Sequence, residues 1–222
     1  MIPAPTSPSA AELAERVLAL AAANPDRRVL VGIAGSPGAG KSTVAAAVVG
    51  RLNELREAAA VHVPMDGFHL ASSTLHRLGA ADRKGAIDTF DGWGFLALLD
   101  RIRHERGHTV YAPGFDRRIE EPVAAQIAVE PETRFVVVEG NYLLVRAEPW
   151  GGVRARLDEA WFCEAPEPER MRRLVERHVA GGRNPDAARA WARDVDGANA
   201  AMIAPTRESA DLIVCCGESG AG

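Results

Sequence analysis

The chain has 222 residues, and its 26 Lys and Arg stand against 30 Asp and Glu, which gives a formal net charge of −4. This balance lacks the basic surplus that holds a phosphodiester backbone, so we expect no nucleic-acid partner. Apolar residues make up 47%, yet no apolar run approaches the roughly 18–20 residues of a membrane helix, so we expect a cytoplasmic globular protein without membrane contact.

The amino-terminal quarter predicts an arm, a helix and a buried strand. Residues 1–8 are rich in Pro, Ser and Thr and predict a loose arm. Ser9 and Glu12 have the spacing of a capping box and open a helix that stops at Asn24. The continuous apolar run 29–34 is typical of a strand buried on both faces of a sheet.

Helices and strands then alternate. We expect a helix over about 41–57, a strand at 60–63, a helix over 92–106 and a buried strand at 135–138. The last third adds a strand at 159–162, a helix over 166–179, a second helix opened by Asn184-Pro185-Asp186 and a closing strand at 211–214. This alternation predicts one α/β domain over 1–222, with a mainly parallel sheet covered by helices on both faces.

The strongest motif follows the first buried strand. Residues 35–42 match G-x-x-x-x-G-K-[ST] in full, between a predicted strand and a predicted helix as the motif requires. The glycines let successive backbone N–H groups face an anion, Lys41 offers a compact charge to the β- and γ-phosphates, and Ser42 offers a hydroxyl to Mg²⁺. A plain glycine turn would not explain why one of only two lysines, Lys41 and Lys84, lies here. The predicted nucleotide-binding residues are Gly35, Ser36, Pro37, Gly38, Ala39, Gly40, Lys41, Ser42 and Thr43.

Two carboxylates follow other strands. Asp66 follows the strand at 60–63, where ligands of an open parallel sheet bind, and there it can deprotonate an attacking hydroxyl. The alternative is an Asp-Gly turn with a surface acid. Glu139 ends the strand at 135–138 and, with Ser42, can hold Mg²⁺; the alternative is a helix-capping acid. His69, three residues after Asp66, is a candidate for the acceptor pocket.

Several motifs together carry a family resemblance, in chain order: Gly35–Thr43, Met65–His69, Arg83–Gly85, Asp88–Asp91 and Val138–Gly140. From about residue 29 to 214 the chain resembles the phosphoribulokinase, uridine kinase and pantothenate kinase family, above all bacterial uridine-kinase-like proteins described as sugar kinases or fructokinases. The resemblance implies a P-loop NTPase fold, ATP with Mg²⁺, and phosphoryl transfer to a hydroxyl of a small metabolite. It also implies that Asp66 is the base.

The same resemblance implies further acceptor contacts and one departure. Lys84 lies in a segment that precedes the acceptor pocket in pantothenate kinases, and Tyr111 and Asp116 bound a segment that ends beside the acceptor. Uridine kinases follow that segment with a base-recognising histidine, where this chain has Arg117 and Arg118. This departure disfavours uridine as the acceptor.

A helical lid is expected over about 166–200. Arg170, Arg173 and Arg177 recur on one helix face, and Gly181-Gly182-Arg183 breaks the chain before the next helix. Lid arginines can bring positive charge to the transferring phosphoryl group, and the resemblance favours Arg177 and Arg183 in that role. The alternative is a solvated arginine face.

The leading hypothesis is therefore an ATP-dependent kinase that acts on a sugar or nucleoside-like alcohol. A nucleotide-dependent switch and a non-catalytic ATP-binding protein remain as alternatives, although the chain has no Asn-Lys-x-Asp segment of the kind that reads guanine in GTPases. The three cysteines, Cys163, Cys215 and Cys216, have no metal-ligand spacing and predict reduced thiols. The sequence leaves the oligomeric state open, a homodimer included.

Overall fold

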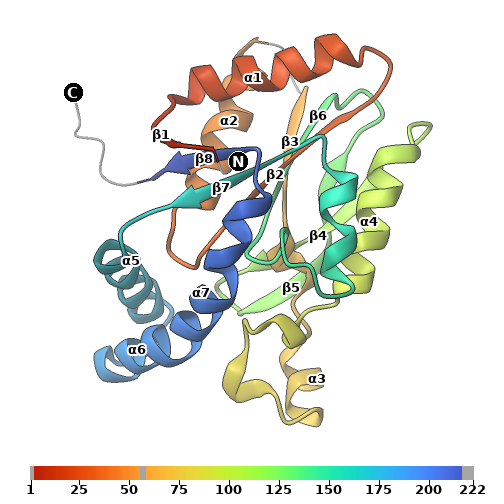
Figure 1. The fold of residues 1–222 in the computed structure, drawn as a ribbon. Coiled ribbons are helices and arrows are strands. Elements are labelled where there is room, and N and C mark those ends of the chain that lie inside the picture. Colours follow the sequence, from red (N-terminus) through yellow and green to blue (C-terminus); the bar gives the residue numbers. More distant parts are fainter. Residues whose placement is uncertain (1–2, 56–58, 217–222) are drawn as a thin grey trace.

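A six-stranded parallel sheet forms the centre of the protein (Figure 1). The computed structural model describes residues 3–55 and 59–216. The strands of the sheet are short and rich in Val, Ile and Ala, as expected for strands buried on both faces. In sheet order they are β1 (Pro5–Thr6), β8 (Leu212–Cys215), β7 (Glu159–Glu164), β2 (Val29–Gly35), β6 (Phe135–Glu139) and β3 (Ala60–Pro64).

Helices cover both faces, as predicted. Helices α1 (Ala10–Ala23) and α2 (Lys41–Leu55) pack on one face, and α4 (Gly92–His104) and α7 (Gly197–Ile203) pack on the other. Alternate residues of β6 show the two cores, since Val137 belongs to the first and Val136 to the second. The capping box at Ser9 and Glu12 is present, whereas the expected end of α2 at Glu57 lies outside the described residues.

Two expectations about local structure need correction. The arm is not loose at Pro5–Thr6, because these residues pair in parallel with Ile213 and Val214 of β8 and extend the sheet. The segment between α4 and β6, to which the sequence analysis assigned no element, forms an antiparallel hairpin of β4 (Val110–Asp116) and β5 (Glu121–Val129). Pro113 and Gly114 obscured the strand pattern, and a register shift falls at this point.

The expected lid region is helical. Helix α5 (Glu167–Ala180) is followed by α6 (Pro185–Trp191), whose predicted N-cap is confirmed by the Asn184 side chain accepting from the N–H of Ala187. A π-helical turn over Ala192–Asp196 joins α6 to α7, and α5, α6 and α7 lie together on the side of β7 and β8 (Figure 1). The remaining helices are α3 (Ser72–Arg77) and 3₁₀ turns at Met65–Phe68, Ala81–Arg83, Ile87–Thr89, Trp150–Gly152, Arg154–Arg156 and Ala204–Ser209.

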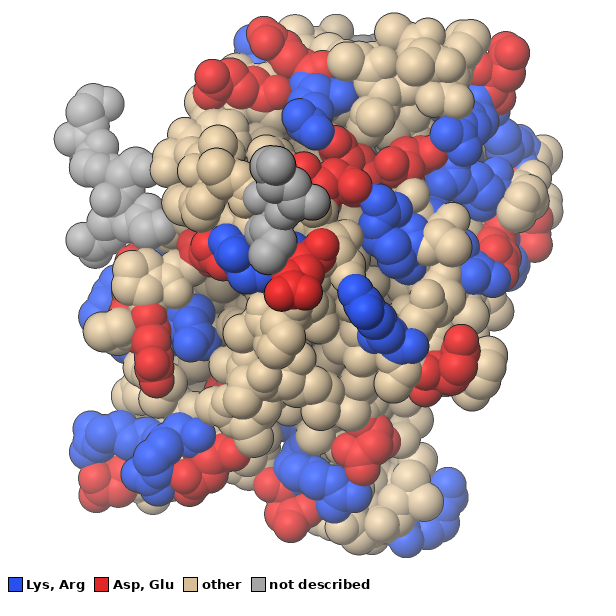
Figure 2. Space-filling model, viewed as in Figure 1, with Lys and Arg blue, Asp and Glu red and all other residues tan. Residues whose placement is uncertain are grey.

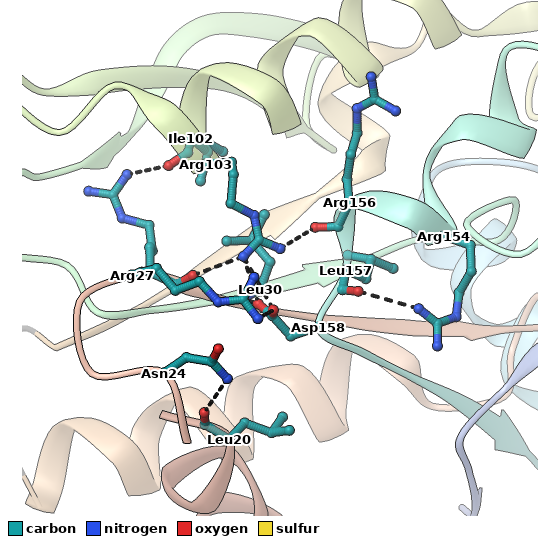
Figure 3. Close-up of polar contacts among 11 residues, drawn as sticks. Leu20, Asn24, Arg27, Leu30, Ile102, Arg103, Arg154, Arg156, Leu157 and Asp158 are labelled. Atoms are coloured by element: carbon teal, nitrogen blue, oxygen red, sulfur yellow. Dashed lines mark hydrogen bonds and ion pairs between the residues drawn. The ribbon is translucent and has the colours of Figure 1, made fainter. Parts of the chain in front are cut away.

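Arginines tie together the amino ends of the central strands. Asp158, just before β7, accepts from the N–H of Leu30 and from Arg103, and it pairs with Arg27 (Figure 3). Arg28, just before β2, is fully buried and donates to backbone carbonyls of Ile102, Glu130 and Thr133. We call Arg27, Arg28, Arg103 and Asp158 the arginine cluster.

Basic and acidic side chains are interspersed over the face seen in Figure 2. Within residues 3–55 and 59–216, no helix has the length and apolar character to cross a membrane.

Candidate active site

The P-loop lies at the carboxyl end of β2, at the opposite end of the strand from the arginine cluster. Lys41, the first residue of α2, is buried, and its Nζ donates to the carbonyl of Ser36 at 3.1 Å. Burial lowers the pKa of Lys41, while the nearby charges of Glu139 and Asp66 oppose that shift. The side chain is therefore held back against the loop, with two carboxylates near its ammonium group.

Helix α5 packs directly on this loop. Gly38 has φ +76°, and a Cβ there would lie 2.7 Å from the carbonyl oxygen of Arg170, so only glycine allows the approach. Two arginines of the predicted helix face secure it, because Arg170 donates to the carbonyl of Pro37 and Arg173 to that of Gly38. Both side chains therefore bind the backbone of the P-loop. Arg177 is the third arginine of the same helix face.

Ser42 and Glu139 meet beside the loop. The Ser42 hydroxyl donates to Oε2 of Glu139 at 3.1 Å, because β6 lies between β2 and β3 and ends level with the start of α2. The Nε2 of His62 lies 3.7 Å from the same carboxylate oxygen. A hydroxyl and a carboxylate are oxygen donors of the kind that Mg²⁺ prefers, so this pair fits the predicted metal role.

Asp66 lies in the 3₁₀ turn that follows β3 and points into the same cavity. Its Oδ2 accepts from Nη2 of Arg117 at 3.0 Å. Arg117 follows β4, and the hairpin reaches Asp66 because Gly67 lets the two backbones touch. A Cβ on Gly67 would lie 2.2 Å from the carbonyl oxygen of Pro113.

His69 lines the cavity between two aromatic rings. Its imidazole stacks on Phe90 with ring centres 4.0 Å apart and lies 5.0 Å from Phe115. Burial lowers the pKa of His69 to about 4, so the ring is neutral at pH 7. Its Nδ1 is buried and has no hydrogen-bond partner within the described chain.

Of the other three predicted acceptor contacts, one lies in the cavity. Lys84 lines it, and its Nζ donates to Ser72 Oγ at 3.1 Å and to the carbonyl of Glu120. Tyr111 is 56% exposed on the hairpin, and Asp116 is held by Arg118 at 2.7 Å. Neither Tyr111 nor Asp116 lines the cavity.

Both predicted lid arginines line the cavity. Nη2 of Arg177 lies 3.9 Å from Oδ1 of Asp196, and Asp196 also bonds to Nε2 of His178 at 2.7 Å. The guanidinium of Arg183 lies 3.8 Å from the ring centre of Trp191. These contacts hold the two cationic groups at the edge of the cavity without an ideal ion pair to either.

One cavity of about 710 Å³ brings these groups together, a volume within the usual range for small-molecule sites. The nucleotide-side residues that line it are Pro37, Gly38, Gly40, Lys41, Ser42, Thr43, Glu139, Arg173, Arg177 and Arg183. The residues on the opposite side include Asp66, His69, Ser72, Lys84, Phe90, Phe115, Arg117 and Glu120. Gly35, Ser36 and Ala39 do not line the cavity; Ala39 is buried and the Ser36 carbonyl receives Lys41.

Sequence reasoning missed several cavity residues on the lid side, among them His178, Trp191, Asp196 and Asn199. Asn199 donates to the carbonyl of Gly85, which ties α7 to the loop that carries Lys84. Each stands alone in a helical pattern without a motif around it, so no local signal distinguished it from an ordinary core or surface position.

Residues 30–221 match the model of the "Phosphoribulokinase / Uridine kinase family". The chain is 32% identical over 209 residues to "Uncharacterized protein YggC" of Escherichia coli, which covers 94% of this chain and 86% of that protein. It is 41% identical over 133 residues to the "ATP-dependent kinase-like protein notR'" of Aspergillus versicolor, covering 57% and 77% of the two chains.

A crystal structure of a "putative fructose transport system kinase" from Silicibacter sp. TM1040 superposes with a TM-score of 0.84 at 38% identity. The match covers 93% of this chain and 99% of that one. These matches confirm the resemblance drawn from the motifs, and this chain belongs to the phosphoribulokinase/uridine kinase family of P-loop kinases.

Proposed function

We propose that the protein is an ATP-dependent kinase that transfers the γ-phosphoryl group to a hydroxyl of a small metabolite, either a sugar or a nucleoside-like alcohol. The observation that carries this proposal is that Asp66 shares one cavity with Lys41. The cavity continues past the P-loop to a side lined by His69, Lys84 and Phe115, where an acceptor can lie.

In this reaction the acceptor hydroxyl oxygen attacks the γ-phosphorus while the bond from phosphorus to the bridging oxygen of ADP breaks. The hydroxyl proton passes to the carboxylate of Asp66. Lys41 neutralises charge on the β- and γ-phosphates. Arg177 and Arg183 neutralise charge on the transferring phosphoryl group in the transition state.

Ser42 and Glu139 would hold Mg²⁺, which when bound neutralises phosphate charge and orients the nucleotide. The helices over about 166–200 act as the lid, and α5 is already seated on the P-loop through Arg170 and Arg173. Most of the rate then comes from positioning and electrostatics, because this transfer needs little covalent chemistry from the protein.

The test is coupled ADP release with Mg²⁺ and ATP across a panel of sugars, sugar acids, sugar phosphates, nucleosides and pantothenate. We expect at least one acceptor to raise turnover far above the acceptor-free rate. Lys41→Met should lower the acceptor-stimulated turnover about 10²–10³-fold. A flat response to every acceptor, with tight ATP binding, would contradict the kinase and favour a nucleotide switch or a non-catalytic ATP-binding protein.

A further inference from the structure

The side of the cavity away from the P-loop includes cationic side chains as well as the proposed base. We call Asp66, His69, Lys84, Phe115 and Arg117 the acceptor end. Its two cationic side chains, Lys84 and Arg117, lie over the same aromatic ring, 5.5 Å and 5.8 Å from the ring centre of Phe115. They come from different segments of the chain, and both line the cavity.

Lys84 has no carboxylate partner within the described residues. Its ammonium donates to a hydroxyl, that of Ser72, and to a backbone carbonyl, that of Glu120. The acid Glu121 accepts from the N–H of Ser72 at 3.0 Å. This hydrogen bond and, to a lesser extent, the charge of Lys84 lower the pKa of Glu121. A cation held by neutral acceptors keeps its charge available for an anion that enters the cavity.

Arg117 has a partner that the reaction needs. Its ion pair occupies Oδ2 of Asp66, the carboxylate that is proposed to receive the hydroxyl proton. The Asp66 side chain is 31% exposed and that of Arg117 is 54% exposed, so water screens the pair and the cost of separating it is small. An acceptor hydroxyl can approach Asp66 once the guanidinium finds another anion.

The other two residues of the acceptor end, His69 and Phe115, are neutral, whereas the cavity wall beside them also includes the acid Glu120. His69 carries no charge at pH 7, and the two aromatic rings beside it, those of Phe90 and Phe115, are apolar. The exposed Glu120 contributes its backbone carbonyl to Lys84. His69, Lys84 and Arg117 are all placed around the ring of Phe115, and all of them line the cavity.

We propose that the acceptor is a hydroxyl compound that also carries a carboxylate or phosphate group, which Lys84 and Arg117 bind. The anion of the acceptor exchanges for Asp66 as the partner of Arg117, and the exchange frees Asp66 to take the hydroxyl proton. This inference rests on the proposed function and narrows the acceptor to sugar acids, sugar phosphates and related hydroxy acids.

The first test needs no knowledge of the acceptor. With the nucleotide end filled by a non-hydrolysable ATP analogue and Mg²⁺, inorganic phosphate is titrated calorimetrically into the full-length protein. We expect one further phosphate site whose affinity falls at least about 10-fold in Arg117→Gln and in Lys84→Met, since each removes a charge-assisted hydrogen bond. Arg118→Gln is the matched control, because Arg118 pairs with Asp116 outside the cavity.

The absence of that phosphate site, or its retention in both cavity variants, would overturn the proposal. Thermal unfolding and binding of the ATP analogue, measured on every variant, exclude loss of fold as the cause.

The second test compares matched acceptors by ADP release: glycerol with glycerate, glucose with gluconate, and ribose with ribose 5-phosphate. We expect the active anionic member to exceed its neutral partner about 100-fold or more in kcat/KM. Arg117→Gln should lower this ratio mainly through KM for the anion. The gluconate and ribose 5-phosphate arms separate a carboxylate site from a phosphate site.

The outcomes distinguish the two proposals. Equal use of neutral and anionic partners would overturn the anionic acceptor and leave the kinase standing. No stimulation by any acceptor would contradict the kinase itself, whether or not phosphate binds.

Discussion

Arginines at the two ends of the central strands have different surroundings. At the amino ends, Arg28 is buried and donates to backbone carbonyls. Arg103 is nearly buried and donates to the carbonyl of Arg156 and to Asp158 (Figure 3). At the carboxyl ends, Arg177 and Arg183 line a cavity and are held by a long ion pair or an aromatic face. Satisfied guanidinium donors stabilise a fold, whereas donors left toward a cavity can bind phosphate.

The comparison predicts that substitutions of the charged cavity residues change catalysis much more than stability. The largest effect is expected for Asp66→Asn, which keeps the side-chain shape and removes the proton acceptor. Turnover should fall about 10²–10⁴-fold, while the Kd for ATP and the midpoint of thermal unfolding change little. Steady-state ADP release and calorimetric ATP binding measure these quantities, and full activity in this variant would refute the role of Asp66.

In the arginine cluster the reverse is expected. Arg28→Met removes a buried guanidinium and its hydrogen bonds to the carbonyls of Ile102, Glu130 and Thr133. Of these carbonyls, that of Glu130 keeps the N–H of Thr133 as a donor. We expect the free energy of unfolding to fall by about 3 kcal/mol in urea titrations, with turnover of the folded protein unchanged.

The control for this prediction is Arg51→Gln, which breaks an exposed pair with Glu54 and should cost less than about 1 kcal/mol. If Arg28→Met abolished turnover without lowering the free energy of unfolding, the idea that arginines at the amino ends only stabilise the fold would be wrong.

A smaller effect is expected on the pH dependence of stability, and it comes from His69 at the acceptor end. His69 has a folded-state pKa of about 4, below the ordinary value near 6.5, so the unfolded chain takes up the proton first as pH falls. Its contribution to stability is complete above pH 6.5 and declines down to about pH 4. Between pH 7.5 and 5 the wild type should lose about 2 kcal/mol more than His69→Phe. Parallel urea-unfolding profiles for the two proteins would contradict the buried neutral imidazole.

The nucleotide side was predictable because its residues are contiguous. The motif over 35–43 contains the turn, the helix start and the side chains that face phosphate, and the strand before it is apolar throughout. Glu139 could be added because the end of a buried strand has a known place in a parallel sheet.

The acceptor side was predictable only in part. Asp66 and His69 follow a strand end, but Arg117 lies 51 residues after Asp66 and reaches it through a hairpin that the sequence pattern did not reveal. The contact also depends on the absence of a side chain at Gly67. Tyr111 and Asp116 belong to the same hairpin and lie outside the cavity. Asp116 directly follows the cavity residue Phe115 and so faces the opposite way, whereas Tyr111 lies beyond the register shift at Ala112 and Gly114.

The sequence by itself determined the α/β class, the P-loop with Lys41 and Ser42, and the strand-end carboxylates Asp66 and Glu139, because each depends on local pattern and on short-range backbone chemistry. Tertiary structure decided which charges meet. It buried Arg28 among carbonyls and left Arg117 against Asp66, and both outcomes depend on segments far apart in the chain. Burial and long-range pairing assign the role of an arginine, and neither can be read from its immediate neighbours in the sequence.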